Sequence, residues 1–401
     1  MITLLKVSGF KTLVDFKLHF TKGVNVLIGP NGVGKTNICS ALSVLASMPN
    51  GELNDVLNQM GGANSVFHKT NGKRGREFSI SAEGVCEGVL NNIKSKEEYS
   101  VKYFYDFIVT LKRGGKIAIK EQLYIERKNH VDDYIGVIRV SKDEKKIKYT
   151  ILNSELIGDH KLPPVKLSFD AGPSECLWAI MPRIFYVCHL VGRDLHRISA
   201  INIDPYIARQ ACDIIDPMWM SSNGKFLSNA LYRLSKQEDR ILEINSLLEQ
   251  SIPCCSTIKP EVSQASLKRS FSLIDKNKNL FSANSISDGT IKLLGLLVGI
   301  IDQQEFTMII EEPENYLHPN VLRLITEYLR ETFNDGACII TTHSETILNL
   351  MAPNELIVCS YAENGTTQCK RIGEIKEVED ALNESGFGCG YHYVSGLLTS
   401  L

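Results

Sequence analysis

The sequence predicts an α/β protein built around a mainly parallel sheet. Residues 23–28 form an apolar run that precedes a glycine-rich loop, and residues 37–45 after the loop have helical apolar spacing. Strand and helix patterns alternate again over residues 307–359, which is the order that a parallel sheet requires. Residues 77–152 alternate apolar with polar side chains and predict an antiparallel subdomain with one solvated face.

The glycine-rich loop runs from Gly29 to Thr36 and consists of a glycine, four residues and then Gly-Lys-Thr. Glycines let the backbone wrap closely around phosphates, because a Cβ atom would obstruct the inward-pointing N–H groups. We expect Lys35 to reach the β- and γ-phosphates and the Thr36 hydroxyl to bind Mg²⁺. The helix that follows adds the partial positive charge of its N-terminus. The loop therefore predicts a nucleotide-binding site.

Composition and charge are those of an ordinary globular chain. Of 401 residues, 43% are hydrophobic and 22% are charged, which suffices for a large core and allows two or three domains. The net charge of -2 excludes a strongly basic protein, so any nucleic-acid surface must be a local patch. The 11 cysteines include no C-x-x-C pair, and the first residues lack a signal-peptide profile. The longest apolar run, residues 293–301, is too short for a bilayer. We expect reduced thiols and a cytoplasmic protein.

Residues 1–152 are expected to form the N-terminal half of a nucleotide-binding head together with the antiparallel subdomain. The strands are predicted at residues 2–8, 13–20, 77–82, 101–112, 116–127, 134–140 and 146–152. A tight turn at residues 113–116 joins two of them. Residues 46–76 indicate loop with short helix, and the most basic segment of the chain is residues 69–76. That segment is either a contact for a phosphate backbone or a solvated loop.

An inserted, mainly helical lobe is expected over residues 153–283. It would begin with a crossing segment and a buried strand at residues 183–188. Amphipathic helices are expected at residues 226–234 and 239–248, with short strands within residues 256–274. The second half of the head would then occupy residues 284–360, and residues 361–401 would be a C-terminal extension. This second half of the head would contain a helix at 290–301, strands at 307–310, 337–341 and 355–359, and helices at 319–333 and 344–350.

Two carboxylates follow the strand predicted at residues 307–310. A strand that ends in two acids would place one on Mg²⁺ and the other beside an attacking water. Glu311 is the candidate for the metal, directly or through a coordinated water, and Glu312 is the candidate general base. The alternative is a strand that ends in acids at the solvent boundary.

Two further segments extend this pattern. His343 comes just after the strand predicted at residues 337–341 and is placed to reach a γ-phosphate, although an isolated histidine there is more often structural. Ser287, Asp288 and Gly289 open the helix that begins at Thr290. They form either an anion-binding helix start or an ordinary N-cap.

In this order, the four segments resemble the ATP-binding-cassette type of ATPase. More narrowly, they are similar to the soluble RecF, SMC and OLD-like AAA-family ATPases of prokaryotic antiviral defence systems. The resemblance covers about residues 1–60 and 283–360, and its most specific string is Glu-Glu-Pro-Glu-Asn-Tyr-Leu-His-Pro at residues 311–319. It implies an ABC-ATPase head, which is a P-loop NTPase fold, and hydrolysis of ATP with Mg²⁺.

The resemblance also implies a role for each matching residue. The phosphates would be held by Asn31, Gly32, Val33, Gly34, Lys35, Thr36 and Asn37. Thr36 and Glu311 would hold Mg²⁺, Glu312 would polarise water, and His343 would be the switch histidine. Ser287, Asp288 and Gly289 would complete the ATP site of a second subunit, and residues 315–318 would lie in the loop that crosses that interface.

Four residues depart from the family pattern or extend it. The family has a glutamine after the strand that leads into the helical lobe, and here His189 follows Val187-Cys188 and would substitute for it. Glu311 replaces the usual aspartate, which favours a water-mediated metal contact. The family contacts the base from the first turn, which makes Lys11 and Thr12 candidates.

Two features of larger relatives are not expected in this chain. Residues 153–283 show no sustained heptads, so the long coiled coil of SMC proteins is missing. After His343 we find no acidic triplet that would mark the nuclease domain of OLD proteins. We therefore expect a homo-oligomer, at least a dimer, that works with a separate nuclease or toxin effector and without a membrane. The alternatives are a RecF-like DNA-binding repair ATPase and, with less support, a transporter ATPase subunit.

Overall fold

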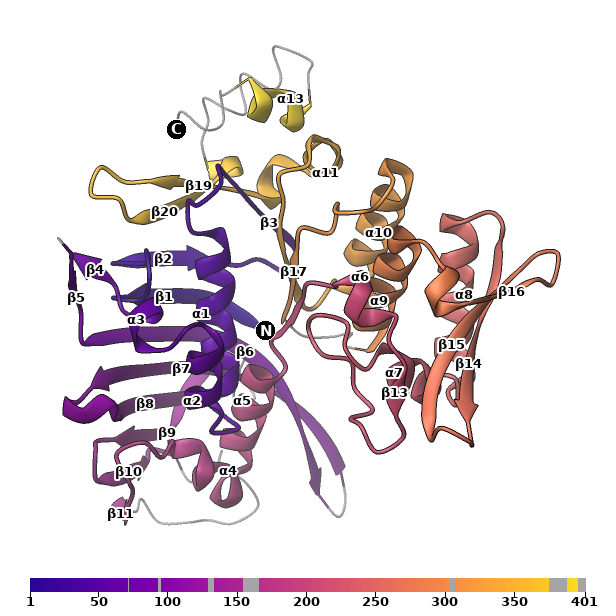
Figure 1. Ribbon diagram of the computed structural model, residues 1–401. Helices are drawn as coiled ribbons and strands as arrows, with labels where there is room; N and C mark the ends of the chain where they lie inside the picture. Colours follow the sequence, from indigo (N-terminus) through magenta and orange to yellow (C-terminus); the bar gives the residue numbers. More distant parts are fainter. Residues whose placement is uncertain are drawn as a thin grey trace. The chain divides into compact units, whose positions relative to one another are not determined.

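The computed structural model describes residues 1–70, 72–92, 95–128, 133–153, 166–302, 307–374 and 388–395. The chain divides into two compact units (Figure 1). Unit 1 contains Met1–Thr21, Gly29–Ile198 and Val358–Lys370, and unit 2 contains Lys22–Ile28, Ser199–Ile357 and Arg371–Leu401. The predicted lobe of residues 153–283 is thus divided at Ile198. No helix in the described ranges has both the length and the apolar character needed to cross a membrane.

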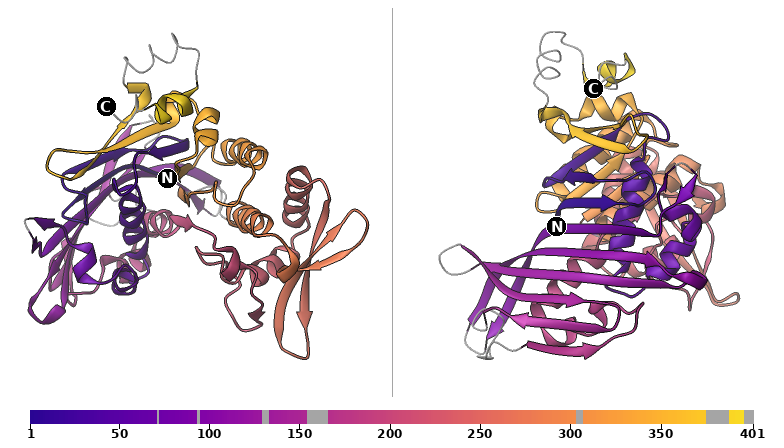
Figure 2. Two further views of the ribbon diagram at one scale, coloured as in Figure 1. Left: turned by 45° about the horizontal axis from the view of Figure 1, so that its top comes forward. Right: turned by 90° about the vertical axis from the view of Figure 1, so that its left-hand side faces the viewer.

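Unit 1 is built on an antiparallel sheet that has eight strands among the described residues, in the order β11-β10-β9-β8-β7-β6-β1-β2. Figure 2 shows these strands side by side, from indigo to magenta. Their bounds are β1 Ile2–Ser8, β2 Phe16–His19, β6 Glu77–Asn92, β7 Ser95–Leu111, β8 Ile117–Lys128, β9 Tyr134–Lys142, β10 Lys146–Ile151 and β11 Lys166–Asp170. The predicted antiparallel subdomain is confirmed.

Alternating side chains give this sheet one buried face. Along β7, Tyr103, Tyr105, Phe107 and Val109 are buried at every second position, as expected from the two-residue period of a strand. Helices α1 and α5 lie against one face of the sheet (Figure 1). The other elements of unit 1 are short. The helices are α1 Lys35–Ser47, α2 Leu53–Gln59, α3 Ala63–Val66, α4 Met181–Ile184 and α5 Tyr186–His196, and the hairpin strands are β4 Lys69–Thr70 and β5 Lys73–Arg74.

The buried strand predicted at residues 183–188 is wrong, because this stretch belongs to helices α4 and α5. Val187, Val191 and Leu195 are buried at a spacing of four residues, which is the helical period. A run of five apolar residues, 184–188, taken alone does not distinguish a buried strand from the start of a helix. The strand that enters the core sheet comes later, as β12 Ser199–Ile201.

Unit 2 contains the parallel core that the sequence predicts. β12, β17 Thr307–Glu311, β18 Ala337–Thr341 and β3 Gly23–Ile28 pair in that order, and each pair is parallel. The sheet continues to β19 Leu356–Tyr361 and β20 Thr367–Arg371, where the chain passes between the two units. Because parallel strands share one carboxyl edge, the residues of unit 2 that follow β12, β17 and β18 emerge at the same edge.

Helices and a small antiparallel sheet make up the rest of unit 2. The helices are α6 Pro205–Ala208, α7 Leu227–Leu234, α8 Glu238–Ser251, α9 Asp288–Asp302, α10 Pro319–Thr332, α11 Glu345–Leu350 and α13 Cys389–Val394. The sheet consists of β13 Cys212–Asp213, β14 Cys255–Ser263, β15 Lys268–Asp275 and β16 Leu280–Ser282. The helices predicted at residues 226–234, 239–248 and 290–301 and the short strands within 256–274 are therefore confirmed.

Two glycines let the apolar helix α9 pack closely on Ile201, the last residue of β12, and on Ile203, two residues further along the chain. A Cβ atom on Gly299 would lie 2.3 Å from Cδ1 of Ile201, and one on Gly295 would lie 3.0 Å from the side chain of Ile203. Both distances are at or below the closest approach of real Cβ atoms, so larger residues would push the helix outward. This packing holds the second half of α9 against the carboxyl end of β12.

Candidate nucleotide-binding and hydrolysis site

The phosphate loop of unit 1 has a backbone that only glycine adopts without strain. Gly29, Gly32 and Gly34 have φ angles of 145°, 83° and 108°. A Cβ atom on Gly29 would lie 2.3 Å from the carbonyl oxygen of Cys359, and one on Gly34 would lie 2.1 Å from Oγ1 of Thr367. The glycines therefore keep open a concave backbone of the kind that surrounds phosphates.

Lys35 opens helix α1 directly after the loop and is only 7% exposed. Its ammonium donates to the carbonyl oxygens of Gly29 at 2.7 Å and Pro30 at 3.1 Å. The positive charge is thus held over the loop, where phosphate oxygens would be stronger partners than neutral carbonyls. Asn31, Gly32 and Thr36 are exposed beside it, Asn37 is half-buried, and the Val33 side chain is buried beneath the loop.

A hydroxyl network that the sequence did not reveal supports the loop from below. Oγ1 of Thr367 donates to the carbonyl oxygen of Val33 at 2.7 Å and lies 2.6 Å from Oγ1 of Thr12. The Asn37 amide donates to Thr12 at 2.8 Å, and the Tyr361 hydroxyl donates to the carbonyl oxygen of Gly32. Thr367 and Tyr361 belong to β20 and β19, more than 300 positions after the loop, so no local pattern could indicate them.

Lys11 and Thr12, the candidates for base contacts, lie beside the loop within unit 1. Nζ of Lys11 donates to Oγ of Ser40 at 2.9 Å, on helix α1. Lys11 has a φ of 49°, and its backbone carbonyl lies 2.6 Å from Nδ1 of His68. Both residues therefore have structural contacts, and their contact with a base stays a prediction.

In unit 2, the two predicted carboxylates stand at the carboxyl end of β17. Glu311 is the last residue of the strand and pairs in register with Thr341 of β18. Glu312 is exposed, has a φ of 45°, and its backbone N–H donates to the carbonyl oxygen of Thr341 at 2.9 Å. The amide of Asn315 donates to Oε2 of Glu312 at 2.9 Å. Strained backbone of this kind is frequent at functional sites.

Glu314 ties this loop to the segment that carries His343. Its Oε1 accepts from Oγ1 of Thr342 at 2.7 Å and from the backbone N–H of His343 at 2.9 Å. The His343 ring lies 3.5 Å, through Nδ1, from the hydroxyl of Tyr393. The structure thus brings Glu311, Glu312 and His343 together at one edge of unit 2. Glu314 was missed as a functional residue, although it stands two positions after Glu312.

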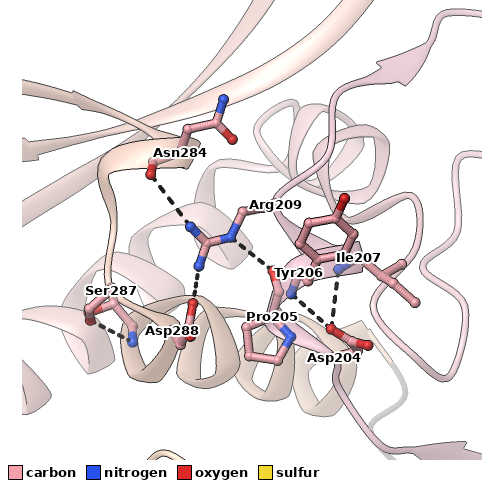
Figure 3. Close-up of polar contacts among 9 residues, drawn as sticks. Asp204, Pro205, Tyr206, Ile207, Arg209, Asn284, Ser287 and Asp288 are labelled. Atoms are coloured by element: carbon pink, nitrogen blue, oxygen red, sulfur yellow. Dashed lines mark hydrogen bonds and ion pairs between the residues drawn. The ribbon is translucent and has the colours of Figure 1, made fainter.

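The segment Ser287–Gly289 caps helix α9 in the way that the sequence allowed (Figure 3). Oγ of Ser287 accepts from the backbone N–H of Thr290 at 3.2 Å. Arg209 holds the segment by an ion pair with Asp288 and by donating to the carbonyl oxygen of Asn284 at 3.5 Å. Ser287 and Asp288 are exposed, so the segment is accessible to a ligand or to another molecule.

Gly289 of the same segment packs against the loop after Glu312. A Cβ atom on Gly289 would lie 2.5 Å from the carbonyl oxygen of Tyr316, whose side chain is 65% exposed. Within unit 2, the start of helix α9 is therefore in direct contact with the loop that follows the carboxylates.

Two family profiles match separate parts of the chain. Residues 1–162 match one described as "AAA ATPase domain", and residues 202–349 match one described as "AAA domain, putative AbiEii toxin, Type IV TA system". Both ends of the chain resemble AAA ATPase domains. A search of curated proteins finds no match.

Solved structures of Smc heads share the architecture. An Smc head bound to the C-winged helix domain of ScpA is 12% identical, with a TM-score of 0.50 over 93% of this chain and 99% of that one. An Smc head with an extended coiled coil, bound to the C-terminal domain of ScpA derived from Pyrococcus furiosus, is 11% identical, with a TM-score of 0.51 over 95% of this chain and 99% of that one. The fold is that of an ABC-type ATPase head.

The residues of this ATPase head fit a nucleotide and Mg²⁺ by their chemistry. The glycine loop of unit 1 leaves the space that a Cβ atom would fill, and Thr36 in the same unit carries a hydroxyl oxygen. Glu311 in unit 2 carries a carboxylate; both groups are of the kind that Mg²⁺ prefers, and a metal site that uses the two stays a prediction. Among the described residues, no three His, Cys, Asp or Glu side chains are grouped to hold a metal ion on their own.

His189 does not follow a strand, so the reason for assigning it to the glutamine position is removed. It lies within helix α5 of unit 1, is exposed, and stacks on Tyr186 with ring centroids 5.9 Å apart. The strand beside β17 is β12, and the polar residues after it are Asn202 and Asp204. Because β12 has only three residues, no strand pattern is visible there in the sequence.

Proposed function

We propose that this ATPase head binds ATP with Mg²⁺ and hydrolyses it in the cytoplasm at sites shared between subunits. The observation that carries the proposal is the glycine cradle that closes on the buried ammonium of Lys35. It is supported by the carboxylate of Glu312, which the Asn315 amide holds at the carboxyl edge of a parallel sheet. Together these groups supply phosphate binding and a base.

We assign the residues separate roles in phosphate binding, metal binding and proton transfer. The loop N–H groups and Lys35 would hold the phosphates, and Thr36 and Glu311 would hold Mg²⁺. Bound Mg²⁺ would neutralise negative charge on the phosphate oxygens. Glu312 accepts a proton from the attacking water at the oxygen that Asn315 leaves free, and His343 senses the γ-phosphate. Ser287, Asp288 and Gly289 of a second copy close the site.

The first experiment compares ATP turnover of the full chain with that of Glu312→Gln. The variant should retain ATP binding and lose at least about 100-fold in kcat, because the amide cannot accept the proton. Glu331→Gln, which changes an exposed carboxyl group on α10, is the matched control and should turn over ATP at the wild-type rate. Wild-type turnover by Glu312→Gln would refute the assigned base.

The shared site is tested by mixing two inactive variants. Lys35→Met lacks the phosphate cation, and Ser287→Arg blocks the signature segment, so each should be inactive alone. In a mixed dimer, one site takes both intact halves, so a 1:1 mixture of exchanging subunits should recover about a quarter of the wild-type rate. An inactive mixture with proven subunit exchange, or full turnover by a strict monomer, would contradict shared sites.

The setting that we propose is antiviral defence, in which this head is the sensor or motor of a separate nuclease or toxin. The match to a profile that names an AbiEii toxin supports a toxin-related system, and the Smc heads solved with ScpA domains support partner binding by such a head. Phage should form fewer plaques on cells that express the chain with its neighbouring genes than on cells without them. Equal plaque counts with wild type and Lys35→Met would argue against the role.

A RecF-like DNA-binding repair ATPase is the second candidate. The observation that favours it is the β4–β5 hairpin, in which Lys69, Lys73 and Arg74 are exposed, followed by exposed Arg76. Binding of labelled duplex DNA should weaken steeply with salt and fall when Lys73, Arg74 and Arg76 become Gln. DNA binding that is unchanged in this triple variant would exclude the hairpin as the contact.

A further inference from the structure

Helix α9 carries a buried lysine one turn after the signature segment. Lys292 is 1% exposed, and its Nζ donates to the carbonyl oxygen of Ile203 at 3.3 Å, which is a long hydrogen bond. Burial lowers the pKa of Lys292, and the carboxylates of Glu314, Glu312 and Asp204 oppose that effect, Glu314 most strongly. The Lys292 ammonium is therefore buried, and the carboxylate whose charge favours it most is that of Glu314.

Glu314 has an unsatisfied oxygen on the same side of unit 2. Its Oε1 already accepts from Thr342 and from the backbone N–H of His343. Its Oε2 is buried and has no hydrogen-bond partner in the part of the chain that the structure describes. A buried carboxylate oxygen without a donor is costly, so a small movement that brings a donor to it is favourable.

Lys292 is a candidate donor, because its ammonium is buried in the same unit and the charge of Glu314 acts on it. We propose that Lys292 and Glu314 form a positioning pair, in which the ammonium moves from the Ile203 carbonyl to Oε2 of Glu314 when nucleotide closes the site. This proposal rests on the proposed ATPase function. It connects the signature segment through helix α9 to Glu314, and through Glu314 to the loop that carries His343.

The geometry explains why the pair acts on catalysis rather than on ATP affinity. Lys292 and Glu314 are both in unit 2, and neither belongs to the phosphate loop. When a phosphate binds Ser287–Gly289 and displaces this segment, the displacement reaches Lys292 within one turn of α9, since Lys292 follows Gly289 by three residues. The pair then fixes Glu314, which lies two residues after the proposed base and holds the backbone of His343.

The test measures kcat and KM for ATP in the full chain. Lys292→Met and Glu314→Gln should each lower kcat by about tenfold or more with KM within about twofold, because ATP still binds but the loop is not fixed. The double variant should be no more than about twofold slower than the slower single variant, because both changes remove one interaction. Lys292→Arg keeps the charge and should retain at least about a third of kcat.

The matched control is Arg233→Met, which breaks the ion pair with Asp302 in the last turn of the same helix at 2.5 Å. It should lower stability and leave kcat within about twofold of wild type. An equal loss of kcat in Arg233→Met would show that any loosening of α9 suffices, and this would overturn the pair. Independent, multiplying effects of Lys292→Met and Glu314→Gln would overturn it as well.

A second measurement does not require turnover. A non-hydrolysable ATP analogue should slow hydrogen exchange at the backbone amides of Thr342 and His343 more in wild type than in either single variant, and the double variant should match the singles. Equal slowing at these amides in all four proteins would overturn the proposal. A wild-type chain that binds the analogue and fails to hydrolyse ATP would instead refute the ATPase function, which separates the two failures.

Discussion

The side-chain amide of Asn315 donates a hydrogen bond to Oε2 of Glu312 across 2.9 Å, three residues along the same turn. Both side chains are exposed, so this bond orients a carboxylate that packing does not fix. The φ of 45° at Glu312 directs the backbone into the turn. A positioned oxygen is what general-base catalysis requires, since the proton acceptor must lie within hydrogen-bond reach of the water.

Asn315→Ala should therefore lower kcat about tenfold and leave KM for ATP unchanged, because only the orientation of the base is lost. Asn315→Asp should be slower still, since a second carboxylate would repel Glu312. Steady-state kinetics on both variants check this. Asn334→Ala removes an exposed asparagine amide that donates to the Glu331 carbonyl at 3.0 Å, and it serves as the control with wild-type kinetics. A raised KM in Asn315→Ala would assign Asn315 to nucleotide binding instead.

Gly34→Ala should abolish nucleotide binding, because the new Cβ would lie 2.1 Å from Oγ1 of Thr367 and 2.8 Å from Oγ1 of Thr12. Gly51→Ala is the control for backbone strain alone. Gly51 also has a positive φ, of 73°, and a Cβ there has no atom within 4 Å. Its cost should be about 1 kcal/mol in the free energy of unfolding, with ATP binding intact. Titration of a fluorescent ATP analogue and urea unfolding separate the two effects, and normal binding by Gly34→Ala would contradict the cradle.

Thr367→Val should weaken nucleotide binding by about tenfold, because it removes the hydroxyl that donates to the Val33 carbonyl at 2.7 Å and contacts Thr12. The change keeps the shape of the side chain and so tests the hydrogen bonds alone. Thr367→Ser restores the hydroxyl and should recover most of the affinity. Equal affinities for the valine and serine variants would show that the network does not support the loop.

The phosphate loop and the carboxylates could be predicted because their chemistry depends on neighbours in the chain. Gly29 to Thr36 and Glu311 to Glu312 have a fixed spacing that makes the motif visible. Thr367 and Tyr361 could not be predicted, since their contacts with the loop join residues more than 300 positions apart. Lys292 lies in an apolar helix where a single lysine gives no sign of its burial.

The error at residues 183–188 has a similar cause. The stretch contains the end of α4 and only the first residues of α5, and the helical period of α5 appears only when Leu195 is included. Asn315 is different, because its spacing of three residues from Glu312 was visible. The family resemblance implies that this loop lies at a subunit interface. The structure adds the hydrogen bond from Asn315 to Glu312 within the same turn.

Glu121 of β8 makes the stability of the protein depend on pH. Burial raises the pKa of Glu121 from 4.5 to about 7, although bonds from the Tyr105 hydroxyl and the Leu177 N–H and the charge of Lys142 oppose this. The folded state then keeps a proton that the unfolded state has lost, so stability is greatest below about pH 4.5. It falls as the pH rises to about 7, by about 3 kcal/mol.

Glu121→Gln should remove this dependence and raise the free energy of unfolding at pH 8 relative to wild type. The glutamine oxygen can accept from the Leu177 N–H, and its amide can donate to the Tyr105 oxygen, so the buried contacts persist without a charge. Urea unfolding at pH 5.5 and pH 8 measures both effects, with Glu126→Gln on the same strand as the control for a half-exposed carboxyl group. Equal stability of the wild type at the two pH values would contradict this prediction. It would show that the Glu121 carboxylate ionises in the folded protein without a loss of stability.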